Sequence, residues 1–353
     1  MTTNCASKVA VSRTETTLIF AFVQSSAVLG TFGNIYGLYL LSRIPLNIYL
    51  RRYLKVLTLW DVCALVFAFC YYYGIHNVVN GSVVALYLVR FCNGPLITAL
   101  TASVWTTVLI AFARFVAVVR PFSSRTGRTM LRHSWKLSSL VAMAASVYCI
   151  PTHYELQLRD CDQNGSIHLQ LILGFLSDKR YLFVYRTICY AFFVTVGPFA
   201  VILVLSAVML CVMEQQGRCR RQMSVGCRQR QRRRAVRSRP KRLVMVLFVK
   251  FLLFNVLPTT LFLITLSGGA SLLERRTMEL LIGLGNLLVV CNSATNCLVY
   301  IPWTWRPRLY RSVSTRSVQA RLGTVVSTET FDRISMDELE SNSVQYSAHH
   351  SVV

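Results

Sequence analysis

Apolar residues in this chain stand in seven long blocks, with neither the alternation of a β-strand nor the one-sided rhythm of a surface helix. A helix that crosses a bilayer needs roughly 20 such residues, and all blocks except the short fourth one approach or exceed that length. The blocks are residues 18–41, 54–75, 86–118, 137–151, 181–213, 243–266 and 278–301. The pattern predicts an all-α membrane protein, a seven-transmembrane helix bundle within residues 17–311.

The two ends of the chain lack such blocks. Residues 1–16 are polar and show no cleavable signal, so the first helix is expected to direct its own insertion. Residues 312–353 are rich in Ser, Thr and acids, which favours a disordered cytoplasmic tail. Phosphorylation there would create negative charge for a basic partner such as an arrestin. The last three residues, Ser351–Val353, are typical of a ligand for a PDZ groove.

Charge distribution sets the expected orientation. The chain is 54% hydrophobic and only 15% charged, yet its net charge is +24. The cations cluster after the first, third, fifth and seventh blocks, and not over a globular surface, which argues against nucleic acid as the partner. The positive-inside rule places these segments in the cytosol and the N-terminus outside, as in a multi-pass protein of the plasma membrane. Basic segments beside a membrane also attract anionic lipid.

The segments predicted to lie outside carry features of an extracellular surface. Asn80 and Asn164 each begin an Asn-X-Ser glycosylation sequence, and both fall on the predicted outer side. Most of the twelve cysteines stand inside apolar blocks, where a small buried side chain is the simplest interpretation. Cys92 and Cys161 face the oxidising side and could form a disulfide.

A few polar residues interrupt the apolar blocks. Asp61 is the only acid deep within a block, and its carboxylate needs a proton, a cation or hydrogen-bond donors there. Polar residues of other blocks could surround it, namely Asn34, Ser103, Asn292, Ser293 and Asn296. Their oxygens would suit a small hard cation such as sodium, but the same groups could serve only to join helices. The residues alone leave both interpretations open.

Several short motifs resemble the rhodopsin-like (class A) G-protein-coupled receptors. They are Gly33-Asn34, the stretch from Leu57 to Asp61, Ala113-Arg114-Phe115, and the stretch from Asn296 to Tyr300. The resemblance implies a cytoplasmic switch for G-protein coupling that comprises Arg114, Phe115, Asn296 and Tyr300. It also implies a sodium-type site around Asp61, with Ser103 eleven residues before Arg114. Sodium would then be an allosteric modulator, and no other cofactor is expected.

More specific stretches are similar to invertebrate FMRFamide-type neuropeptide receptors. These are residues 101–108, 151–155, 185–187 and 292–296. The resemblance implies an extracellular peptide ligand, held by a vestibule of Tyr72, His76, His153, Glu155, Arg186 and Glu279. Glu155 or Glu279 could pair with an arginine of the peptide, although ordinary interfacial aromatics and loop charges would give the same pattern. Leu96 and Val290 replace the aspartate and lysine that amine and retinal receptors use.

Three other functions compete with a peptide receptor. A class A receptor for a different ligand, orphan or chemosensory, would share the same motifs. An ion-coupled transporter could use Asp61, but the chain shows no internal repeat. An enzyme is not expected, because the sequence shows no metal cluster and no nucleophile with a base.

The chain departs from the family pattern at its switch. Ala113 replaces the acid that normally restrains the arginine, and Cys297 replaces the proline of the seventh-helix motif. Val256 and Ser206 replace a tryptophan and a tyrosine, and Cys92 stands 22 residues before Arg114 where the family usually has 25. Lys250 would repel Arg114 if it faced it. The sequence therefore predicts an arginine without a partner at rest, and raised basal activity.

Overall fold

A computed structural model describes residues 13–43, 46–78, 82–119, 133–163, 166–222, 228–266 and 275–300. The chain divides into two compact units, Met1–Ile301 and Pro302–Val353, and every described residue lies in the first unit. The predicted tail, Arg120 after the third helix and the segment around Asn80 fall outside the described residues.

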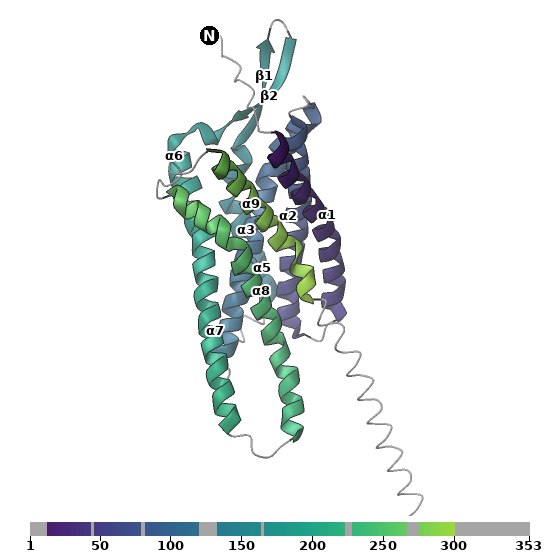
Figure 1. Ribbon diagram of the computed structural model, residues 1–353, viewed down its shortest axis with the longest axis vertical. Helices are drawn as coiled ribbons and strands as arrows, with labels where there is room; N and C mark the ends of the chain where they lie inside the picture. The colour runs from purple at the N-terminus through teal and green to yellow at the C-terminus, as the bar shows by residue number, and fades with distance from the viewer. Residues whose placement is uncertain are drawn as a thin grey trace, which may run out of the picture. The chain divides into compact units, whose positions relative to one another are not determined.

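The first unit is a bundle of long helices (Figure 1). Its main helices are α1 (Arg13–Arg43), α2 (Ile48–Val78), α3 (Val83–Val119), α5 (Ser134–Tyr148), α7 (Val196–Gln222), α8 (Arg228–Leu266) and α9 (Arg275–Ala294). Six spans in the described part of the chain are long and apolar enough to cross a membrane, and α5 completes the seven with 15 residues. The predicted seven-helix bundle is confirmed, and each predicted block falls on a helix.

A β-hairpin marks one end of the bundle, called here the hairpin end. The 3₁₀ turn η1 (Ile150–Tyr154) follows α5 and leads into β1 (Leu156–Gln163), which pairs antiparallel with β2 (Ser166–Leu173). The hairpin projects beyond the helix ends (Figure 1). The opposite end, where α1 ends and α2 begins, is called the basic end after Arg43, Arg51 and Arg52.

The fifth span begins as an irregular helix and contains a proline. The short helix α6 (Lys179–Tyr181) is followed by two π-helical segments, η3 (Leu182–Cys189) and η4 (Ala191–Thr195), before α7 begins. Pro198 has no N–H to donate, so a carbonyl of the preceding π turn loses its partner. The Trp105 indole of α3 donates to the Phe193 carbonyl at 2.6 Å and so ties α3 to this irregular turn.

Two helices depart from the predicted blocks at the basic end. The basic segment from Glu214 to Arg242, for which the sequence suggested a solvated loop or helix extensions, consists of the extended ends of α7 and α8 around residues 223–227. In the seventh span, α9 ends at Ala294, a turn follows at Thr295, and helix resumes over residues 296–300. The interruption occurs although Cys297 replaces the motif's proline.

Close contact between α1 and α9 holds the seventh span in place. A Cβ atom on Gly33 would come within 2.7 Å of Cys297 Sγ, and one on Gly30 would overlap Ala294. The glycines therefore let the two backbones approach, as small residues do between membrane helices. This contact sets the depth of Ser293 and Asn296, which belong to the site described next.

Candidate functional site

Asp61 lies at the centre of a polar cluster in the middle of the bundle. Its side chain is fully buried. Ser103 Oγ of α3 donates to Asp61 Oδ1 at 2.7 Å, the amide of Asn296 donates to Asp61 Oδ2, and Ser293 lies beside the carboxylate. The structure thus brings together α2, α3 and the seventh span at the residues that the sequence singled out.

Lys250 of α8 enters the same cluster, which the sequence did not predict. Its ammonium donates to the Asn292 carbonyl and to the side-chain oxygen of Asn296. Asn296 therefore stands between a carboxylate and an ammonium, with its nitrogen toward Asp61 and its oxygen toward Lys250. Lys250 points into the polar cluster and joins α8 to α9.

The cluster extends toward α1 and toward the basic end. Asn34 of α1 donates to the Ser293 carbonyl at 2.9 Å. The hydroxyl of Tyr300 lies 3.3 Å from Thr58 Oγ1 of α2, and both side chains are fully buried. Tyr300, predicted as part of the switch, is thus held against α2 one helical turn beyond Asn296.

Arg114 lies in the last part of α3, and no acid of the part of the chain that the structure describes forms an ion pair with it. Its neighbour Ala113 is buried, and Phe115 is half-buried. The terminal nitrogen Nη2 of Arg114 is buried and has no hydrogen-bond partner among the described residues. This geometry agrees with the sequence expectation of an arginine that no acid restrains.

The predicted ligand vestibule contains an ion pair between Arg186 and Glu155. Arg186 of η3 donates to Glu155 at 2.6 Å, and the Glu155 side chain is fully buried. Tyr181 donates to the other Glu155 oxygen at 2.7 Å, and Asn93 of α3 donates to the pair at 3.4 Å. Glu155 is therefore already neutralised, and the predicted role of holding a ligand arginine does not fit its surroundings.

The other predicted vestibule residues are dispersed. Tyr72 and His76 of α2 pack on the ring of Phe20, whose centroid lies 6.0 Å from that of Tyr72 and 6.5 Å from that of His76. His153 lies over Gly94 of α3, with its ring 3.4 Å from Thr98 Oγ1. Burial and the nearby Arg90 lower the pKa of His153, which favours the neutral imidazole. Glu279 is exposed on the first turns of α9.

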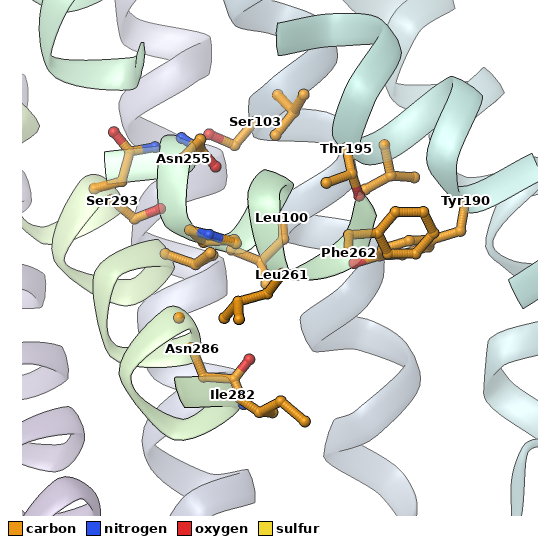
Figure 2. Close-up of a pocket in the computed structure, with 16 residues that line it drawn as sticks. Leu100, Ser103, Tyr190, Thr195, Asn255, Leu261, Phe262, Ile282, Asn286 and Ser293 are labelled. Atoms are coloured by element: carbon orange, nitrogen blue, oxygen red, sulfur yellow. The ribbon is translucent and has the colours of Figure 1, made fainter. Parts of the chain in front are cut away.

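A pocket of about 280 Å³ lies between α3, the fifth span, α8 and α9. Figure 2 shows its sixteen lining residues, with Asn255 near Ser103 and Ser293 at one end and Asn286 and Ile282 at the other. None of these sixteen residues carries a charge. Three amide side chains, those of Asn255, Asn286 and Asn292, supply much of its polarity.

Three pocket residues are also members of the polar cluster, namely Ser103, Asn292 and Ser293. The pocket and the Asp61 cluster are therefore continuous. Asn255 and Asn286 were not predicted as site residues from the sequence, although each interrupts an apolar block. Asn286 lies seven residues before Ser293, a spacing that places both on one helix face, and this spacing was the available signal.

Cys92 is a free thiol in the structure. It is buried in α3 and lies beside Cys70 of α2. Cys161 lies on β1, opposite His168 of β2 in the hairpin. The predicted bridge between Cys92 and Cys161 is therefore not formed in the structure. Of the two predicted glycosylation sites, Asn80 and Asn164 both lie outside the described residues.

Comparison with known families agrees with this architecture. The family model described as 7 transmembrane receptor (rhodopsin family) matches residues 42–300, which is most of the chain, and the chain belongs to this family. No curated protein matches the chain. Family membership makes the chain a multi-pass membrane receptor and implies an extracellular ligand and a G protein as partners; members of this family are generally not enzymes.

Proposed function

We propose that the chain is a plasma-membrane receptor for an amidated, FMRFamide-like neuropeptide. Binding would favour an open state in which α8 moves outward and exposes Arg114 to a G protein. The ligand must bind the open state more tightly than the closed state to shift this equilibrium. The lack of charge in the deep pocket is the observation that carries the choice of ligand.

The pocket suits the uncharged end of such a peptide. A free carboxylate or an ammonium would lose its hydration there without gaining a counter-charge from any of the sixteen lining residues. A carboxamide can instead exchange hydrogen bonds with the amides of Asn255 and Asn286. Tyr190, Phe262 and Leu261 offer apolar surface for an aromatic residue beside that carboxamide.

Ser103, Asn292 and Ser293 belong both to the pocket and to the Asp61 cluster, so they connect the pocket to the part of the bundle nearer the basic end. A ligand that contacts Asn292 or Ser293 touches groups whose neighbours bind Asp61 and Lys250. Because Lys250 belongs to α8, a change at the pocket floor acts on the helix that must move. On the cytoplasmic side, the basic segments would bind anionic lipid, and the tail would bind an arrestin and a PDZ protein through Ser351–Val353.

The synthetic peptide Phe-Met-Arg-Phe-amide and its free acid provide the direct test. Calcium and cyclic AMP signals are recorded from cells that express the full chain, with mock-transfected cells as the baseline. The amide is expected to be at least about 100-fold more potent, because the free acid would bury an unneutralised carboxylate.

Variants of the pocket extend the test. Asn286→Leu should weaken the amide about tenfold through the loss of a hydrogen bond, whereas Asn77→Leu, at a partly exposed asparagine of α2 outside the pocket, should leave potency unchanged. Equal potency of amide and free acid would refute the proposed ligand class. A response confined to uncharged small molecules would favour a chemosensory receptor instead.

A further inference from the structure

The polar cluster around Asp61 contains a cation supplied by the protein itself, the ammonium of Lys250. A lysine in the middle of a membrane helix is costly to bury unless its charge is compensated. Lys250 meets that condition, because two oxygens of the seventh span accept its ammonium protons and the charge of Asp61 attracts it. The amide of Asn296 lies between the two charges and bonds to both.

Most oxygens that could face a metal ion are already occupied by donors. Asp61 Oδ1 accepts from Ser103, and Asp61 Oδ2 accepts from Asn296. The side-chain oxygen of Asn296 accepts from Lys250. The side-chain oxygens of Asn34 and Asn292 are buried and have no hydrogen-bond partner among the described residues. Hard cations need several oxygens at once, and a cation here would compete with these donors for the oxygens of Asp61 and Asn296.

The small volume beside Lys250 gives a second argument against a metal site. A cavity of about 10 Å³ remains beside Lys250, lined among others by Ser103, Asn292 and Asn296. That volume is about what a single water molecule requires. A sodium ion with its remaining waters would not fit in this small cavity, because the Lys250 ammonium already binds the Asn292 carbonyl and the Asn296 side chain there.

We propose that Lys250 is the built-in counter-ion of Asp61 and takes the place of a sodium ion in this receptor. The residues do not fit the sodium site that the family resemblance implied. The ammonium is tethered to α8, so it also fastens this helix to α9 in a way that a diffusible ion would not. Lys250→Met should remove the charge, leave a space of nearly the same shape and open the site to sodium.

The thermal stability of the purified full chain in lipid nanodiscs tests this proposal without any ligand or G protein. Its failure is therefore distinguishable from failure of the peptide hypothesis. Melting is followed with a thiol-reactive dye while sodium chloride replaces choline chloride at constant ionic strength. The wild-type melting temperature is expected to stay constant within about 1 °C. Lys250→Met is expected to melt lower in choline and to gain about 4 °C as sodium rises.

Two further variants define the site. The double variant Asp61→Asn/Lys250→Met should lose the sodium response, because the carboxylate that would hold the ion is gone. Lys136→Met, at an exposed lysine of α5, should behave as wild type. A sodium-specific rise in wild type as large as that in Lys250→Met would overturn the proposal, and so would a Lys250→Met protein that ignores sodium. If Lys250→Met does not fold, the wild-type comparison alone still decides.

Discussion

Arg114 is the residue whose surroundings depart most from what its charge requires. Its Nη2 atom is buried without a partner in the described structure, and Ala113 stands where an acid would restrain it. A guanidinium nitrogen that is buried without a partner raises the free energy of the state that buries it, because its hydration is lost without compensation. The closed state is therefore expected to be only weakly preferred, with measurable basal signalling.

Ala113→Asp should lower the basal signalling of the receptor. A carboxylate beside Arg114 would stabilise the closed state by about 1 kcal/mol, which lowers the open population about fivefold. The measurement is basal guanine-nucleotide exchange on a G protein in membranes with equal receptor content. Ala113→Asn is the matched uncharged control, and Arg114→Ala defines zero coupling. Identical exchange by the Asp and Asn variants, or wild-type exchange equal to that of mock membranes, would contradict this account.

At the residue scale, some members of the site were predictable from the sequence and others were not. The grouping of Asp61, Ser103 and Asn296 was predicted, because each is a polar interruption of an apolar block. Lys250 was not placed there, because a single helix sequence does not reveal the rotation of α8 against α9. Glu155 was assigned to the ligand for a similar reason: its partner Arg186 is 31 residues away and on another element.

At the scale of elements, the Glu155 network joins the segments at the hairpin end. Glu155 follows η1, Asn93 lies on α3, Tyr181 ends α6, and Arg186 lies in η3. These four segments meet at one fully buried carboxylate. Removal of one charge leaves the other buried and unpaired, which is more costly than removal of both.

Glu155→Gln is therefore expected to destabilise the receptor by about 3 kcal/mol, equivalent to a fall of about 8 °C in melting temperature. The double variant Glu155→Met/Arg186→Met should melt several degrees above Glu155→Gln, since no charge remains unpaired. Both are compared with wild type by dye-monitored melting in nanodiscs. A double variant no more stable than Glu155→Gln would show that the pair does not act as a unit.

The elements themselves were predictable to different degrees. Apolar length located all seven spans, because every residue that faces lipid must be apolar. The π-helical start of the fifth span was not predictable, since Pro198 marks an interruption but does not specify how the preceding turn widens. The helix interruption at Thr295 was not predictable either, because the sequence has no proline there. It accompanies the close packing of Gly30 and Gly33 against residues 294–297.

At the scale of the whole molecule, orientation in the membrane rests on charge. The cations Arg43, Arg51 and Arg52 lie at the end of the bundle where α1 ends and α2 begins, which the positive-inside rule assigns to the cytosol. The hairpin end then faces outward. This assignment requires that the segments holding Asn80 and Asn164 reach the glycosylating compartment.

The orientation predicts two N-linked glycans. Digestion of the expressed receptor with an N-glycosidase should shift its electrophoretic mobility by two steps. Asn80→Gln and Asn164→Gln should each remove one step, and the double variant should be insensitive to the enzyme. An epitope fused to the N-terminus should bind antibody on intact cells, whereas one inserted between α7 and α8, within residues 223–227, should require permeabilisation. The reverse labelling would place the basic end outside, and the surface around Arg114 could not then meet a G protein.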